Sequence, residues 1–206
     1  KLQNTGRDLL ADVKKIQNMG LEVEGGFIVG FDGDSTSVFQ KQWEFIQKSG
    51  IVTAMVAMLQ APAGTTLHKR LKDEGRIQGE VTDGTDGTTN ILPVMGKGSL
   101  ERGYHDLVAR LYSPGAFYSR VKTFLREFRP SGNLGYQLSA GHILAVPRSI
   151  LRLGIIGQER LEYWKLFFWT LFRRPVLIPL ALKLAIYGHH FSRTLAGRFS
   201  PISEEA

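Results

Sequence analysis

The residues whose types and spacing could support chemistry form a glycine-rich turn after a short apolar run. Glycines bound the run at 27–29, and the segment ends in Gly33-Asp34. Because glycine has no Cβ, a backbone or a small molecule can approach the chain closely at such positions. The pattern favours a parallel strand buried on both faces, with Asp34 and Ser35 capping the following helix. The alternative from spacing alone is that these glycines only allow close packing in a strand-to-helix turn.

Other residue types that often carry chemistry show no catalytic or metal-binding spacing. The sequence contains no Gly-x-Ser-x-Gly elbow and no phosphate-binding loop with lysine. The aspartates of residues 82–90 lack the spacing of a calcium loop. The histidines lack metal-ligand spacing and are expected to be structural or surface residues: His68, His105, His142, His189 and His190. The residues therefore suggest neither hydrolysis nor nucleoside triphosphate use, and no nucleic-acid partner is predicted.

The elements that must position the glycine-rich turn alternate between helix and strand. Helices are predicted at 5–19, 35–49 and 66–74, and strands at 21–29 and 51–59. This order is typical of a parallel α/β layer, in which strands end at the same edge of the sheet. The turns at 30–34 and 60–65 are therefore expected to be neighbours. Two strands cannot close a barrel, and an unpaired strand edge predicts further strands upstream.

The remainder of the sequence predicts a loop followed by helices. Residues 79–98 are rich in glycine, threonine and aspartate, which favours a linker or a lid loop. Residues 99–206 carry helical spacing, and Ser113-Pro114 is typical of a helix start. The basic residues of the helix that follows are expected on a solvated face: Arg120, Lys122, Arg126 and Arg129.

The last third is rich in aromatic and basic residues. Residues 161–172 are densely aromatic, and Arg173-Arg174 separates them from an apolar helix at 176–187. Neither run reaches the roughly 20 apolar residues that span a bilayer. One interpretation is a non-enzymatic helical module that binds a membrane surface or a partner protein, and the other is a helical hairpin packed on the rest of the chain. The module would use Trp164, Phe168, Trp169, Arg173 and Arg174.

Composition sets wider limits. The sequence has 206 residues and no cysteine, which excludes disulfides and cysteine-ligated zinc and agrees with a cytoplasmic location. The net charge of +7 allows an anionic partner, although sequence outside this chain could balance it. The predicted location is cytoplasmic, with peripheral membrane contact if the C-terminal helices bind lipid.

Two segments resemble radical S-adenosylmethionine enzymes. Residues 26–34, Gly-x-Ile-x-Gly-Phe-x-Gly-Asp, resemble the fifth barrel strand, which passes the adenine of the cofactor, and residues 60–65 resemble the turn after the sixth strand. The closest likeness is to the cobalamin-dependent branch. The resemblance implies that S-adenosylmethionine is bordered by Gly26, Ile28, Gly30, Asp34, Gln60, Pro62 and Gly64. Gln60 is the expected polar contact, whereas Asp34 is expected to shape the turn.

One departure from that family concerns its iron–sulfur cluster. The family holds a [4Fe–4S] cluster with a Cys-x3-Cys-x2-Cys loop, and this chain has no cysteine. We therefore expect the C-terminal part of a longer enzyme, with the cluster and cobalamin bound upstream; a separate degenerate protein is the alternative. The implied activity is radical chemistry on a small-molecule or lipid-like substrate, with methyl transfer as one outcome. The predicted fold is α/β, with a partial parallel (β/α) barrel at 1–78, a loop at 79–98 and an all-helical extension at 99–206.

Overall fold

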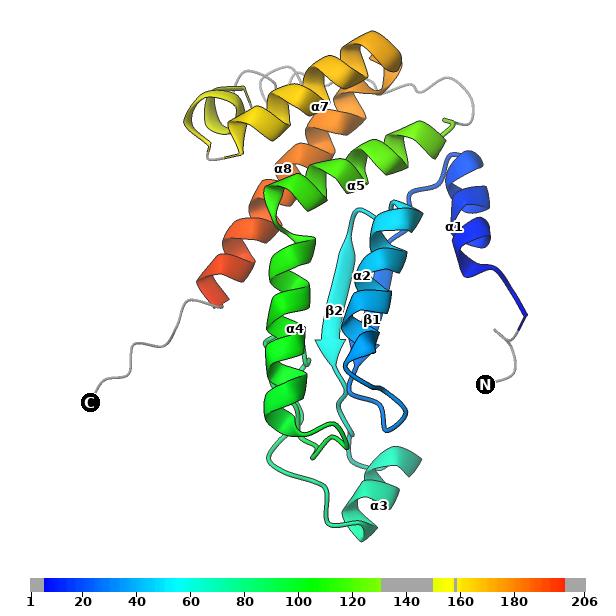
Figure 1. Cartoon of the computed structure of the whole chain (residues 1–206), viewed down its shortest axis with the longest axis vertical. Coiled ribbons are helices and arrows are strands. Elements are labelled where there is room, and N and C mark those ends of the chain that lie inside the picture. Colours follow the sequence, from blue (N-terminus) through cyan, green and yellow to red (C-terminus); the bar gives the residue numbers. More distant parts are fainter. Residues whose placement is uncertain (1–5, 131–149, 158, 199–206) are drawn as a thin grey trace. The chain divides into compact units, whose positions relative to one another are not determined.

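The computed structural model describes residues 6–130, 150–157 and 159–198 and shows a mixed α/β protein that is mostly helical (Figure 1). Residues 131–149 of the predicted all-helical extension lie outside the described residues. The chain forms two compact units, each built from separate segments. Of the described residues, the helical unit comprises 6–24, 45–52, 112–130, 150–157 and 159–197, and the sheet unit comprises 25–44, 53–111 and 198.

The sheet unit is built on two parallel strands, β1 (Gly25–Val29) and β2 (Ala54–Met58). Their register pairs Gly25 with Ala54 and Val29 with Met58. The predicted parallel pair is confirmed, but both strands are shorter than expected because only five residues of each find a ladder partner.

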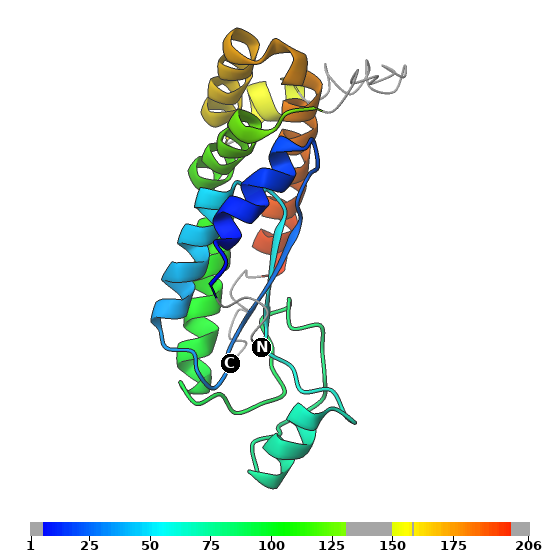
Figure 2. The ribbon, with the colours of Figure 1, turned by 90° about the vertical axis from the view of Figure 1, so that its right-hand side faces the viewer.

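One face of this strand pair is covered by helices. The register places the side chains of Phe27, Val29, Val56 and Met58 together on that face. Figure 2 shows α2 (Ser37–Ser49) and α4 (Lys97–Leu111) on the same side of the strands. A Cβ on Gly103 of α4 would overlap the Phe39 ring, so glycine lets the two helices pack closely.

The opposite face of the strand pair is bare. It carries Gly26 and Ile28 from β1, with Met55 and Ala57 from β2 beside them. Ile28 is 45% exposed and Met55 is 55% exposed. The prediction of a strand buried on both faces is therefore wrong, because Gly26 and Ile28 of β1 are exposed on this side. We call these four residues the bare face.

A short helix and a second small core follow β2. α3 (Thr66–Asp73) begins at Thr65, whose hydroxyl oxygen accepts a hydrogen bond from the His68 N–H at 3.1 Å. The core contains Leu59, Ala61, Leu71 and Ile91. An antiparallel bridge joins Ile77 to Ile91, so the chain after α3 returns to the end of β2.

The helical unit contains α1 (Leu9–Asn18), α5 (Pro114–Glu127), η2 (Ile150–Ile156), α7 (Arg160–Arg173), η3 (Pro175–Leu177) and α8 (Ile178–Arg198). The predicted start of α5 at Ser113-Pro114 is confirmed. α1 begins later than predicted, because the Asp8 carboxylate caps it by accepting from the Ala11 N–H at 3.0 Å. Within the described ranges, no helix combines the length and the hydropathy needed to cross a bilayer.

Arg120 corrects the expectation of a solvated basic face on α5. Its side chain is fully buried, and its guanidinium donates to the Val52 carbonyl at 3.2 Å. The guanidinium also lies 5.3 Å from the centre of the Phe117 ring. Burial lowers the pKa of Arg120 to about 10, so the group stays charged at neutral pH. Arg120 thus joins α5 to the segment after α2.

We expect Arg120→Ala to lower the free energy of unfolding by about 3 kcal/mol, because it removes a charged hydrogen-bond donor and leaves a cavity. Arg120→Met keeps most of the volume and should lose less. Urea unfolding of both variants checks this. Equal loss in the two variants would mean that the filled volume contributes nothing, whereas no loss in Arg120→Met would mean that the guanidinium contributes nothing beyond its bulk.

Candidate functional site

The glycine-rich turn after β1 is held by Asp34. Its Oδ2 accepts hydrogen bonds from the Gly30 N–H at 2.9 Å and the Phe31 N–H at 3.0 Å. The carboxylate therefore folds back onto the turn, as expected for a turn-shaping residue, and α2 begins only at Ser37. Gly30 has φ +104°, and a Cβ there would lie 3.0 Å from a Leu100 methyl. Turn geometry and packing both require glycine at position 30.

The turns after β1 and β2 lie side by side, as predicted. The Leu59 N–H donates to the Val29 carbonyl at 2.8 Å, which extends the strand pair up to the turns. Asp32 then links the first turn to the region of α3 through ion pairs with Arg70 at 2.7 Å and Arg76 at 2.6 Å. The hydrogen bond from Arg76 is the main reason why the pKa of Asp32 lies below its ordinary value.

Gln60 contacts the loop that we predicted as a linker or lid. Its side-chain amide donates to the Thr88 carbonyl at 2.8 Å and to the Thr82 hydroxyl at 3.1 Å. Its Oε1 accepts from the Thr82 N–H at 3.4 Å. The polar atoms of Gln60 are therefore engaged within the protein, and a cofactor contact by this residue stays a prediction.

The same loop, residues 82–90, lies along the outer edge of β2. The Met58 N–H donates to the Gly84 carbonyl at 2.9 Å, and the Thr89 hydroxyl donates to the Leu59 carbonyl at 2.6 Å. The Asn90 side chain, which is buried, accepts from the Ala61 N–H at 2.8 Å and donates to the Ala61 carbonyl at 3.1 Å. The loop thus satisfies backbone groups at the end of β2 and closes that edge.

Two consecutive Asp-Gly-Thr turns give the loop its shape. The Asp83 carboxylate accepts from the N–H and the hydroxyl of Thr85, each at 2.8 Å. Asp86 repeats the pattern with Thr88 at 3.0 and 2.7 Å. The Tyr104 hydroxyl of α4 donates to the Thr85 carbonyl at 2.7 Å, so the loop is fixed to the helix that covers the sheet.

Pro62 and Gly64 shape the turn that leads into α3. The Pro62 carbonyl accepts from the Thr65 N–H at 3.2 Å and from its hydroxyl at 2.7 Å. Gly64 has φ +84°, a backbone conformation that favours glycine. Both residues are exposed and have a clear structural role here.

The bare face is an exposed apolar surface beside the two turns. A Cβ on Gly26 would meet no atom within 4 Å, and its neighbours Ile28, two residues along β1, and Met55, its partner on β2, are exposed. No group of metal-ligating side chains is present among the described residues. Met55 was missed from the sequence because its role depends on strand register, and Asp32 and Asn90 were missed because their partners are distant in the chain.

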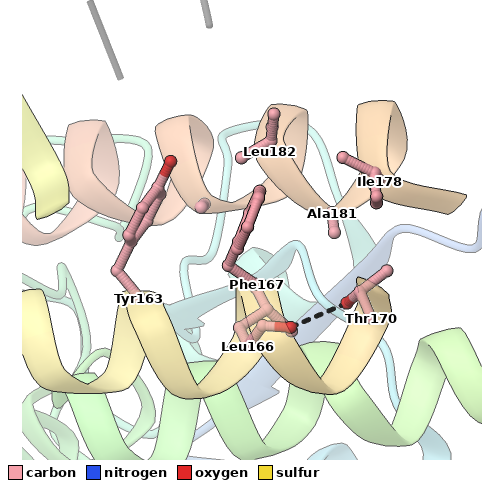
Figure 3. Close-up of a pocket in the computed structure, with 8 residues that line it drawn as sticks. Tyr163, Leu166, Phe167, Thr170, Ile178, Ala181 and Leu182 are labelled. Atoms are coloured by element: carbon pink, nitrogen blue, oxygen red, sulfur yellow. Dashed lines mark hydrogen bonds between the residues drawn. The ribbon is translucent and has the colours of Figure 1, made fainter. Parts of the chain in front are cut away.

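In the helical unit, a narrow apolar gap lies between α7 and α8 (Figure 3). Tyr163 and Phe167 project from α7 toward Ala181 and Leu182 of α8. The Thr170 hydroxyl donates to the Leu166 carbonyl at 2.8 Å. The gap does not admit a water molecule, so it is a packing seam of the predicted hairpin rather than a ligand site.

Asn90→Ala should release the 82–90 loop, because the N–H and carbonyl of Ala61 lose their partner in a buried position. We expect a loss of about 2 kcal/mol in stability and faster hydrogen exchange in residues 82–90. Asn90→Asp keeps an acceptor for the Ala61 N–H but places a charged oxygen against the Ala61 carbonyl in a buried site, so it should also lower stability. If hydrogen exchange in residues 82–90 were the same in Asn90→Ala as in wild type, the Asn90 side chain would not hold the loop in place.

Asp32→Asn should lower stability at neutral pH by about 1 kcal/mol, because the ion pairs are partly exposed. Since the folded pKa of Asp32 lies below its ordinary 3.8, these pairs stabilise the fold above that pH and are lost as pH falls below it. The difference between wild type and Asp32→Asn in urea unfolding should therefore shrink in acid. A difference independent of pH would contradict the ion-pair role.

Two relatives of the chain have names that describe methylating enzymes. It is 30% identical over 195 residues to an uncharacterized methyltransferase of Synechocystis sp., covering 93% of this chain and 36% of the relative. It is 27% identical over 198 residues to the hopanoid C-2 methylase of Rhodopseudomonas palustris, covering 90% and 37%. The chain thus spans just over a third of the length of these curated relatives.

No solved structure matches the chain. A family model described as "Domain of unknown function (DUF4070)" matches residues 65–198, from the start of α3 to the end of α8. That match covers more than half of the sequence. The chain therefore belongs to the DUF4070 family.

Proposed function

We propose that this chain forms part of the cofactor and substrate site of a methyltransferase that uses S-adenosylmethionine. The names of the two relatives, a methyltransferase and a hopanoid C-2 methylase, support methyl transfer. The observation that carries the proposal is the bare face, where Gly26 leaves open space between exposed apolar neighbours. The resemblance of residues 26–34 to the strand that passes the adenine points to the same surface.

The strand pair is proposed to be a segment of a parallel (β/α) barrel wall. Helices cover one face of the strands and leave the other bare, which is the arrangement of a barrel wall whose inner face points toward a site. The 82–90 loop occupies the edge of β2 through the Met58–Gly84 hydrogen bond. Further strands would therefore pair with β1. On that edge the Ile28 carbonyl accepts from the Gln42 amide at 2.9 Å, a side-chain contact that an incoming strand can replace.

S-adenosylmethionine, when bound, supplies the methyl group or the radical that the reaction requires. The residues of this chain would hold and orient it. Gly26 would allow the adenosine to approach the strand, and the side chains of Ile28 and Met55 would shield it from water. Asp34 and Gln60 act mainly by fixing the turn and the loop at the end of the strands. We also propose that S-adenosylmethionine is contacted directly by residues at the ends of the strands: Gly30, Asp34, Gln60, Pro62 and Gly64.

The residues present do not fit an iron–sulfur cluster. Such clusters need thiolate ligands, and the sequence has no cysteine. If the protein uses a [4Fe–4S] cluster, sequence outside this chain must hold it, and we propose the same for cobalamin. The substrate class that we propose is lipid-like, because one relative is named for methylation of a hopanoid.

Gly26→Val in the full-length protein tests the site. A valine side chain would fill the open space and block the cofactor, so S-adenosylmethionine binding should weaken at least about tenfold, which corresponds to 1.4 kcal/mol. Stability should change little, because no atom lies near the added Cβ. Gly30→Val is unsuitable, because its positive φ and the nearby Leu100 methyl would disturb the fold. Equilibrium dialysis and thermal unfolding give the two readouts.

Gly115→Val is the matched control, since position 115 also has no atom near its Cβ and lies at the start of α5. It should bind S-adenosylmethionine like wild type. Wild-type affinity in a folded Gly26→Val protein would exclude the bare face as the cofactor surface.

A further inference from the structure

α7 exposes an apolar stripe to solvent. Leu161 is 70% exposed, Phe168 48% and Phe172 80%. Their spacing of seven and four residues places them on one side of the helix. The opposite side is buried inside the helical unit through Tyr163, Leu166 and Thr170. α7 is therefore apolar on both sides, although only one side contributes to the core. We call Leu161, Trp164, Phe168 and Phe172 the aromatic face.

The rings of the aromatic face are ordered by stacking. Trp164 stacks on Phe168 with centroids 5.5 Å apart, and Phe168 stacks on Phe172 at 6.4 Å. The Trp164 indole N–H donates to the Gly154 carbonyl of η2 at 2.9 Å, which fixes the end of the stack. A surface whose side chains are already ordered loses little entropy on binding.

Exposed apolar residues continue at both ends of α7. Ile155 and Ile156 follow Gly154 in η2, and Val176 follows the last turn of α7; all three are exposed. Single exposed apolar residues are normal on proteins, whereas a run of this extent marks an interaction surface.

Basic side chains lie on α7 together with the aromatic face. Lys165 lies within the stripe, between Leu161 and Phe168, and its side chain is 61% exposed. Arg160 and Arg173 are exposed at the two ends of the helix. Glu162, which pairs with Lys165 at 2.6 Å, is the acidic residue of α7. Apolar rings beside basic side chains match the boundary between acyl chains and anionic headgroups.

We propose that the aromatic face of α7 docks on the surface of an anionic phospholipid bilayer. Leu161, Phe168 and Phe172 would enter the boundary of the acyl chains, and Lys165 and Arg173 would contact headgroup phosphates. The charge pattern favours this partner over a second copy of the chain, because like-charged helix ends would meet in a symmetric dimer. The proposal goes beyond the cofactor site and does not depend on it, although such docking would bring a lipid-like substrate near the protein.

Co-sedimentation of the full chain with vesicles tests the proposal. The protein should pellet with vesicles of phosphatidylcholine and phosphatidylglycerol at low salt, and less with phosphatidylcholine alone or at high salt. The double variant Phe168→Ser, Phe172→Ser should lower the partition coefficient at least about tenfold, because two aromatic side chains no longer enter the lipid. The measurement needs no S-adenosylmethionine, so it is independent of the cofactor site.

A matched control carries Met19→Ser and Val94→Ser, two apolar side chains that are similarly exposed elsewhere. It should pellet like wild type. Failure of the wild type to pellet with anionic vesicles, or equal binding by the Phe168→Ser, Phe172→Ser variant, would overturn the proposal. Light scattering that revealed a dimer, lost in the same variant, would instead assign the face to self-association.

Discussion

The parallel pairing of β1 with β2 is the constraint on which the sheet unit depends. Its register separates the side chains into a face covered by α2 and α4 and the bare face. It also places the two strand-to-helix turns next to each other, where Asp34 and Gln60 can fix them. Parallel pairing needs a covering helix on at least one side, and the close contact of Phe39 with Gly103 provides it. The candidate site is the face of the strand pair that α2 and α4 do not cover.

The 82–90 loop makes the two outer edges of the strand pair different. By bonding to Met58, Leu59 and Ala61, it closes the edge of β2. An open strand edge can pair with another strand. The loop covers the edge of β2, whereas the outer edge of β1 has no such cover from this loop. The outer edge of β2 is therefore occupied at its C-terminal end.

Local signals predicted much of the fold, whereas residues with distant partners were harder to predict. The strands, the start of α5 and the adjacent turns follow from apolar runs, Ser113-Pro114 and parallel topology. Arg120 was misplaced although it lies three residues after Phe117 and four before Phe124, a spacing that itself indicates the buried side. The role of Asn90 could not be predicted, because its partner Ala61 is 29 residues away. Exposure of Ile28 and Met55 depends on what packs over them, which periodicity alone does not determine.

Oxidation of Met55 in the full-length protein tests the central claim most directly. Met55 is exposed on the bare face, and Met19 is similarly exposed in the helical unit. Peroxide converts accessible methionine to its sulfoxide, which mass spectrometry measures residue by residue. The account predicts that S-adenosylmethionine slows oxidation of Met55 and leaves that of Met19 unchanged. If bound S-adenosylmethionine left the rate at Met55 unaltered, the bare face would not be the cofactor surface.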